Sequence, residues 1–192
     1  METQNPTGTP SVPLPTAKTG IISPAQILEK GIVRAADGYP EIVVEGVHNQ
    51  LQQVGIDLRL AKVYRVAGRG ALRLEKRDTV VPELLPMVAH DGIFGFDPDY
   101  QYALDFMEDV AVPEDMAALV IHRSTINRTL GTVLSGMYDP GFRSVGGCGA
   151  IFRPSSYVTI EVGYRMAQIV FFSAESASLY NGQYQGGRNK PK

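Results

Sequence analysis

The sequence predicts an all-β fold, a sandwich, barrel or jelly roll, that begins with one short helix. Two observations indicate strands: the apolar stretches are short, and Gly, Pro or Asp residues separate them along most of the chain. The expected strands lie within Glu41–Val44, Ile56–Leu60, Val63–Val66, Tyr102–Leu104, Ala118–Ile121, Tyr157–Val162 and Gln168–Phe172. The length of 192 residues suits one domain with a tail.

The short helix is expected directly after the N-terminal segment. Ser23 is suited to the N-cap, Pro24 to the first helical position, and Gly31 to the C-terminal stop. Ile27 and Leu28 would form its buried side. A short helical turn is also expected somewhere within 126–134, between two of the predicted strands.

Both ends of the chain differ from the middle in composition. Residues 1–20 are rich in proline and poor in large apolar side chains, which predicts a disordered tail. Residues 178–192 are polar and contain several glycines, which predicts a flexible C-terminal arm. The β domain is therefore expected to span residues 21–177.

Composition excludes several classes of function. The chain is 44% hydrophobic and 20% charged, and its formal net charge of −2 argues against nucleic-acid binding. No apolar run is long enough to span a membrane, and the N-terminus lacks the apolar core of a signal peptide. The single cysteine, Cys148, forms no internal disulfide, so we expect a reducing, cytoplasmic location. One Cys and three His also offer no ligand set for a zinc-dependent deaminase.

Four segments carry residues suited to chemistry, and their order is informative. They are Val54–Leu60, His122–Arg128, Met137–Phe142 and Gly163–Phe172. In this order they resemble the shared motifs of the superfamily of trimeric dUTPases and dCTP deaminases. The resemblance implies a distorted β-barrel or jelly roll of the dUTPase type. It also implies a homotrimer with sites between subunits, and a deoxypyrimidine triphosphate, dUTP or dCTP, as ligand.

The second and fourth segments are suited to binding phosphate. Arg123 offers a planar fork of donors, Ser124 adds a hydroxyl, and Arg128 matches a second Arg in the deaminase form of the motif. Gln168 stands in an Arg-x-Ala-Gln order that matches the family strand closely. Without the other motifs, a solvated basic turn would be the favoured interpretation of the second segment.

The third segment carries the candidate catalytic residue, Asp139. The resemblance implies that this carboxylate contacts the sugar 3′-hydroxyl and positions the attacking water, and that the ring of Phe142 packs on the deoxyribose. A carboxylate can accept hydrogen bonds from a hydroxyl and a water together. Without the other motifs, a plain Asp-Pro-Gly turn would explain the segment.

The first segment contains Asp57, which in the family lies near the phosphate and metal end of the site. A contact with metal through water and a structural hydrogen bond are both open for Asp57. Strand alternation predicts that Ile56, Leu58 and Leu60 face inward and that Asp57 and Arg59 face outward.

The C-terminal arm resembles the deaminase tail that folds over the nucleotide. Its candidate binding residues are Tyr180, Tyr184 and Gln185. Gln183 stands where the family has a Lys, so one positive charge toward phosphate is missing.

The resemblance breaks at the residue that deamination needs. Deaminases of this superfamily use a Glu on the strand after the Asp-Pro-Gly turn, but Val145–Arg153 contains no carboxylate, and the next acid is Glu161. The chemistry therefore favours a dUTP diphosphatase that uses Mg²⁺ to neutralise the triphosphate, with the backbone of the glycine-rich hairpin from Val145 to Gly149 reading the base. Two alternatives remain open: a dCTP deaminase or bifunctional deaminase–dUTPase that uses an acid such as Glu161, and a non-catalytic deoxynucleotide-binding relative.

Overall fold

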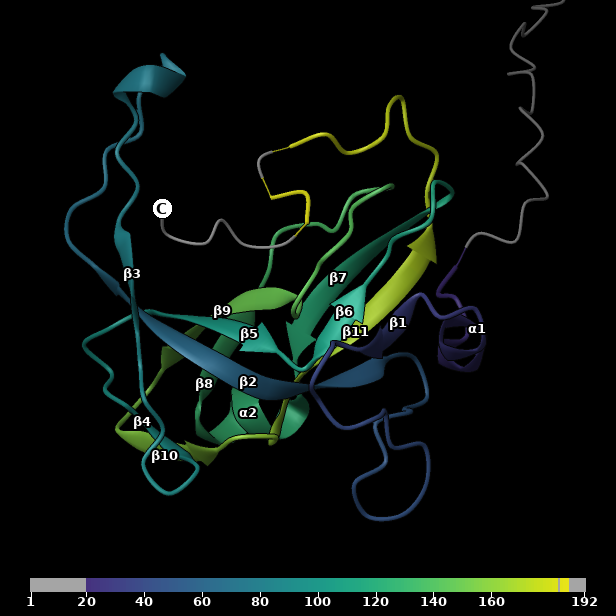
Figure 1. Ribbon diagram of the computed structural model, residues 1–192, viewed down its shortest axis with the longest axis horizontal. Coiled ribbons are helices and arrows are strands. Elements are labelled where there is room, and N and C mark those ends of the chain that lie inside the picture. The colour runs from purple at the N-terminus through teal and green to yellow at the C-terminus, as the bar shows by residue number, and fades with distance from the viewer. Residues whose placement is uncertain (1–19, 183, 187–192) are drawn as a thin grey trace, which may run out of the picture.

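The centre of the structure is a closed barrel of six strands. In this computed structural model, which describes residues 20–182 and 184–186, the sheet order is β11-β7-β8-β9-β5-β2, and β2 closes the barrel by pairing with β11. The barrel strands are β2 (Ile56–Ala67), β5 (Tyr102–Phe106), β7 (Met116–His122), β8 (Gly131–Leu134), β9 (Gly149–Pro154) and β11 (Arg165–Ser173). This confirms the predicted all-β barrel (Figure 1).

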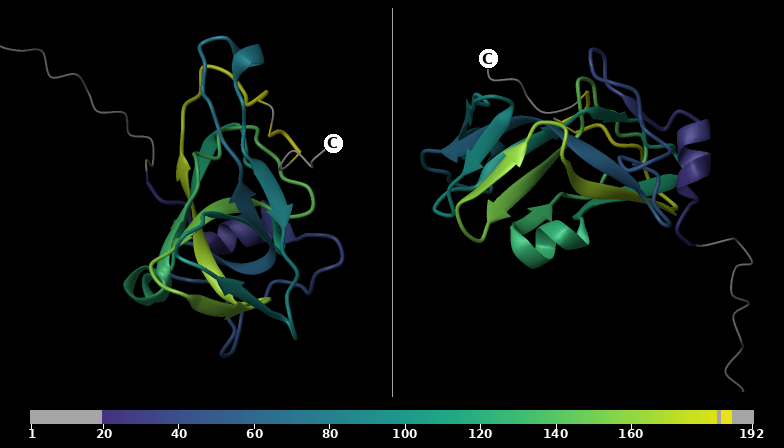
Figure 2. Two further views of the ribbon diagram at one scale, coloured as in Figure 1. Left: turned by 90° about the vertical axis from the view of Figure 1, so that its left-hand side faces the viewer. Right: turned by 90° about the horizontal axis from the view of Figure 1, so that it is seen from below.

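Shorter elements surround the barrel. β3 (Glu83–Pro86) extends the sheet beyond β2, β1 (Val33–Ala35) pairs with β6 (Glu108–Val110), and β10 (Val158–Glu161) pairs with β4 (Ile93–Phe96). The helices are α1 (Pro24–Glu29), α2 (Ser124–Thr129) and the 3-10 turn η1 (Lys76–Asp78). Figure 2 shows that α1 lies at one end of the molecule, while the hairpin that carries η1 projects from the body.

The N-terminal helix forms where the sequence predicts it. Pro24 occupies the first turn, and Gly31 follows with a positive φ of 63°, a conformation that glycine adopts without strain. Ile27 is buried and anchors the helix to the core. Ser23 holds the N-cap position but makes no side-chain capping hydrogen bond.

Aromatic side chains fill the barrel between β4, β5 and β9. Phe96 packs edge-to-face against Tyr102 and Phe152, with ring centroids 5.0 and 5.2 Å apart. All three side chains are buried, so they tie the small β4–β10 sheet to the barrel.

Two of the expected secondary-structure elements differ in the structure. Residues 41–44 form no strand, because the Val43 N–H donates to the side-chain oxygen of Gln50 rather than to a neighbouring strand. The turn expected within 126–134 begins earlier: α2 ends at Thr129, and Gly131–Leu134 is strand β8.

The prediction that Asp57 and Arg59 face outward is wrong. Both are buried, at 0% and 8% exposure, because residues from outside β2 cover that side of the strand. Arg59 pairs with the fully buried Glu108 (Nε to Oε1, 2.7 Å) and donates to the carbonyl of Pro40 at 2.6 Å. Gln50 completes this cluster by donating to Glu108 at 2.8 Å. Each buried charge therefore has a partner, as burial requires.

Within the described residues, no helix is long and apolar enough to cross a membrane. The disorder expected for residues 1–20 falls, except for Gly20, outside the residues that the structure describes, and so does Gln183.

Candidate functional site

Asp57 is the centre of a polar cluster at the end of the barrel nearest α2. Its carboxylate accepts from Arg123 (Nε to Oδ2, 2.9 Å), from Arg165 (Nη1 to Oδ2, 3.3 Å) and from Gln168 (Nε2 to Oδ1, 3.4 Å). The fold brings these residues together because Asp57 and Gln168 are directly paired between β2 and β11, while Arg123 follows the adjacent strand β7. Two guanidinium groups and one carboxylate leave this cluster with a net positive charge.

Opposing effects act on the Asp57 carboxyl. Burial raises the pKa of Asp57 above its ordinary value, and the charges of Arg123 and Arg165 and the Gln168 hydrogen bond oppose that rise. Both arginine side chains keep 22% of their surface exposed, so the positive side of the cluster faces outward. The arrangement suits an anion that approaches the arginines from solvent.

The other predicted phosphate-binding residues lie on α2. Ser124 is the first residue of this helix and Arg128 lies in its last turn, and both side chains are exposed. Ile126, on the opposite side of the helix, is fully buried and fixes α2 to the barrel. The structure thus places Arg123, Ser124, Arg128 and Gln168 at one end of the barrel.

The turn that carries Asp139 has different surroundings. The Phe142 N–H donates to the Asp139 carbonyl at 3.0 Å, which closes the turn, and Gly141 between them has a φ of 85°. Phe142 is 9% exposed and packs against Tyr138 and Tyr180, with ring centroids 4.8 and 5.6 Å away. The Asp139 side chain is half-buried and has no hydrogen bond or ion pair with any residue that the structure describes.

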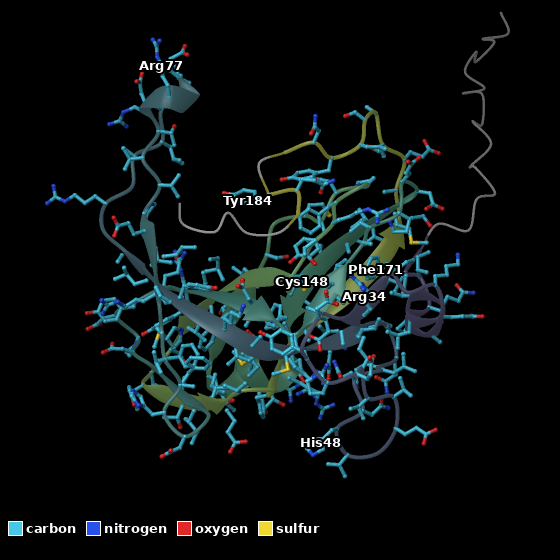
Figure 3. All side chains as sticks on the ribbon, in the orientation of Figure 1. Arg34, His48, Arg77, Cys148, Phe171 and Tyr184 are labelled. Carbon is cyan, nitrogen blue, oxygen red and sulfur yellow. The ribbon has the colours of Figure 1, made fainter. Side chains whose placement is uncertain are left out.

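The C-terminal arm, described over 178–182 and 184–186, lies against this same turn. Tyr180 donates its N–H to the Pro140 carbonyl at 2.8 Å. The Gln185 side chain accepts from the Arg143 N–H and donates to the Gly141 carbonyl, each at 3.0 Å. Tyr184 is exposed on the arm, as Figure 3 shows. The predicted arm residues are therefore grouped with Asp139 and Phe142.

The predicted residues form two groups that lie apart within a single chain: one beside α2 and one around the Asp139 turn. Tyr138 pairs with Ala118 near the beginning of β7, whereas Arg123 follows the end of that strand. About 16 Å of extended chain separates these two levels of the barrel. In Figure 1, α2 lies at the bottom of the barrel and the green loops of residues 135–148 lie at the top.

Several backbone N–H groups of the glycine-rich hairpin from Val145 to Gly149 already donate hydrogen bonds to other residues of the chain. The Gly147 N–H donates to Asp109 Oδ1, and the Cys148 N–H donates to the Glu108 carbonyl, both at 2.8 Å. The Gly149 N–H donates to the Tyr138 hydroxyl at 3.0 Å. Within the described part of the chain, the N–H groups of Val145 and Gly146 have no acceptor, so only this tip is available to a ligand.

Sequence reasoning missed three residues of these groups. Arg165 lies within the Gly163–Phe172 motif, but the motif does not predict its ion pair with Asp57, and the sequence does not predict the contact of Tyr138 with the hairpin. Asp109 is 38 residues from Gly147 in sequence, so no local pattern links it to the hairpin. The Arg-x-Ala-Gln order was a usable signal for Arg165, but nothing local in the sequence indicates the other two.

Three acidic residues could be considered for deamination: Glu161, Glu108 and Asp109. Glu161 ends β10, faces solvent, and belongs to the separate β4–β10 sheet. Glu108 and Asp109 lie beneath the hairpin, but their carboxylates are held by Arg59 and Gln50 and by Gly147 and Ser144. Among the described residues, no group of three or more His, Cys, Asp or Glu side chains could hold a metal ion.

Comparisons with known proteins give a consistent result. A family model described as dCTP deaminase-like matches residues 27–174. The chain is 38% identical over 136 residues to a probable deoxyuridine 5′-triphosphate nucleotidohydrolase of Methanopyrus kandleri, a match that covers 71% of this chain and 88% of that protein. It is 32% identical over 135 residues to a protein of the same description from Methanothermobacter thermautotrophicus, with 70% and 87% covered.

A solved structure shares the fold. The chain is similar to a 2′-deoxycytidine 5′-triphosphate deaminase from Agrobacterium tumefaciens, with a TM-score of 0.57 and 20% identity. The match covers 81% of this chain and 48% of that chain. At this identity the likeness concerns the fold.

Proposed function

Because the chain belongs to the dCTP deaminase-like family of the dUTPase and dCTP deaminase superfamily, we propose that it is a dUTP diphosphatase. The reaction is dUTP + H₂O → dUMP + diphosphate. Two observations carry this proposal: β9 holds no carboxylate, and Asp139 is half-buried and bonded by no residue that the structure describes. The relatives described as dUTP nucleotidohydrolases support the same reaction.

The positive end of the site is suited to the triphosphate. Arg123, Ser124 and Arg128 line the end of β7 and the exposed side of α2, and Gln168 lies beside them on β11. We propose that these four residues bind the phosphate oxygens. Asp57 holds the Arg123 guanidinium in place through their 2.9 Å ion pair, so its role is to orient a phosphate ligand.

The other end of the site is suited to the sugar and the base. Asp139 would accept hydrogen bonds from the 3′-hydroxyl and from the attacking water, which orients that water toward phosphorus. The Phe142 ring would pack on the deoxyribose and exclude a 2′-hydroxyl. The hairpin tip at Val145 and Gly146 offers backbone groups to the base. Tyr180, Tyr184 and Gln185 of the arm would then cover the nucleotide.

Magnesium fits this site as an ion carried by the substrate. Both carboxylate oxygens of Asp57 accept from side chains of the protein, so its direct ligation to a metal does not fit the structure. When bound, Mg²⁺ would neutralise charge on the triphosphate.

The separation of the two groups within one chain supports an assembly. Arg123 follows the end of β7, whereas the turn that carries Asp139 lies beside the beginning of that strand. A homotrimer with each site built between subunits would join the phosphate-binding group of one chain to Asp139 of another. We propose this arrangement, in which no chain acts alone.

Incubation with dUTP tests the proposal. The protein with Mg²⁺ should convert dUTP to dUMP and diphosphate in equal amounts, and removal of the metal with a chelator should suppress the reaction. Binding of dUTP without any turnover would contradict the proposal and support the non-catalytic alternative.

A further inference from the structure

A buried carboxylate lies directly beneath the glycine-rich hairpin. Asp109 is on β6, is only 4% exposed, and stands directly opposite Arg34 of β1. The two side chains form an ion pair, with Arg34 Nη2 3.7 Å from Asp109 Oδ2. The Arg34 side chain is 62% exposed, whereas the Asp109 side chain is buried. Figure 3 labels Arg34 and Cys148 in this part of the molecule.

Asp109 holds both sides of the hairpin tip. Its Oδ1 accepts from the Gly147 N–H at 2.8 Å and from the Ser144 hydroxyl at 3.3 Å. The Ser144 hydroxyl also accepts the Val110 N–H at 2.8 Å, so its donor and an acceptor position are both in use. The residues between these two fixed points are Val145 and Gly146, whose N–H groups have no acceptor among the described residues.

The hairpin backbone does not hold its own conformation without this support. Gly147 has a φ of 109°, and a Cβ atom at this position would overlap the carbonyl oxygen of Phe106. Gly146 also has a positive φ of 81°. Backbone in this region has few internal constraints, since glycine restricts its own dihedral angles least. The hydrogen bond from Gly147 to the Asp109 carboxylate therefore restrains a tip whose own backbone does not fix its conformation.

We propose that Asp109 is a positioning residue for base recognition. This rests on the proposed function, in which the hairpin tip contacts the base of dUTP. Asp109 does not touch the nucleotide; it fixes the direction of the Val145 and Gly146 amides before the nucleotide arrives. Donors that are already oriented lower the entropy cost of binding. These two amides would contact only the base, so the effect should be confined to base binding.

Steady-state kinetics with two ligands tests this role. Asp109→Ala should raise the KM for dUTP roughly tenfold or more, the range expected for hydrogen bonds to a charged group. It should also lower the preference for dUTP over dCTP in competition. The inhibition constant of tripolyphosphate, which contacts only the phosphate-binding residues, should stay the same.

Three further variants separate positioning from general loosening. Asp109→Asn retains an oxygen that can accept from Gly147 and Ser144, so it should recover most of the wild-type KM. Arg34→Ala removes only an exposed ion pair and should change the KM much less than Asp109→Ala. Ser144→Ala removes one of the two bonds and should act in the same direction as Asp109→Ala, which keeps the test available if Asp109→Ala fails to fold.

The outcomes distinguish this inference from the proposed function. If the wild-type protein does not turn over dUTP, the proposed function fails, and the same comparison is made with dissociation constants for dUTP and tripolyphosphate. If folded Asp109→Ala has the same KM or dissociation constant for dUTP as the wild-type protein, the positioning role is overturned. An equal weakening of dUTP and tripolyphosphate would also overturn it, because that would indicate a general loosening of the protein.

Discussion

Asp57 and Asp139 have opposite surroundings, and the difference assigns them different tasks. Asp57 is fully buried and accepts from Arg123, Arg165 and Gln168. Asp139 is half-buried, and no described residue bonds to its side chain. A carboxylate with all its partners in the protein orients its neighbours, whereas one with free oxygens can accept from a substrate hydroxyl and a water. Of the two, Asp139 is therefore our candidate for direct catalysis.

We predict that Asp139→Asn abolishes dUTP hydrolysis while the protein remains folded. The amide has nearly the same shape, but it lacks the negative charge that orients the attacking water. Loss of general-base assistance reduces rates by roughly 10²–10⁴-fold. The rate of diphosphate release and the circular dichroism spectrum measure the two parts of the prediction. Hydrolysis at the wild-type rate would remove Asp139 from the mechanism.

We predict that ionisation of the Glu108 carboxyl lowers the free energy of unfolding as the pH rises. Burial raises the pKa of Glu108 above its ordinary value of 4.5, although hydrogen bonds from Arg59 and Gln50 oppose the shift. The folded state thus holds the proton more tightly than the unfolded state. The resulting stabilisation is complete below the ordinary pKa and is lost as the pH rises through the raised one.

Denaturant unfolding of wild type and Glu108→Gln tests this directly. Between about pH 4 and pH 7, the free energy of unfolding of wild type minus that of the variant should fall as the pH rises. Asp57 titrates in both proteins, so its contribution cancels in the difference. A difference that increases with pH would show that the Arg59 ion pair outweighs desolvation.

At the scale of elements, local patterns were sufficient for some segments and not for others. Pro24 and Gly31 define the limits of α1 through their own backbone preferences, and the apolar run in Gln168–Phe172 marks β11. The segment 41–44 has the composition of a strand, but the Val43 N–H donates to the Gln50 side chain instead of to a neighbouring strand. Pairing is a long-range property, and composition alone does not determine it.

The C-terminal arm is the element whose behaviour should change most with ligand. Its described residues contact the Asp139 turn through Tyr180 and Gln185, mostly by exposed hydrogen bonds. We predict that the arm amides exchange rapidly in the free protein and slowly with a non-hydrolysable dUTP analogue. Hydrogen exchange measured by mass spectrometry reports this, with β5 amides as the unchanging reference. Equal exchange of the arm with and without the analogue would argue against a covering role.

At the scale of the whole molecule, sequence order indicates which motifs hold the candidate residues, but it does not indicate how the fold arranges them. The motifs around Arg123 and Asp139 are close in sequence, yet β7 places them at different levels of the barrel. Conversely, Asp109 and Gly147 are distant in sequence and share a hydrogen bond. The orientation of Asp57 was mispredicted for the same reason, because its partners Arg123 and Arg165 come from other strands.

A site shared between subunits predicts complementation. Arg123→Ala and Asp139→Asn should each lack activity at low dUTP concentration when they are prepared separately. In trimers formed by co-expression in equal amounts, about a quarter of the sites should combine an intact Arg123 with an intact Asp139. Diphosphate release measures the recovery. Mixed trimers with no more activity than either parent would contradict a shared site.

The central claim is that this protein hydrolyses dUTP and does not deaminate dCTP. The most direct measurement incubates the protein and Mg²⁺ with dUTP and with dCTP in parallel, and quantifies dUMP, diphosphate and ammonia. Attack at C4 of cytosine needs a proton acceptor, but β9 has no carboxylate, and burial raises the pKa of the Cys148 thiol well above its ordinary value. We predict dUMP and diphosphate from dUTP, and no ammonia from dCTP. Steady release of ammonia from dCTP, with dUTP or dUMP appearing, would contradict the account.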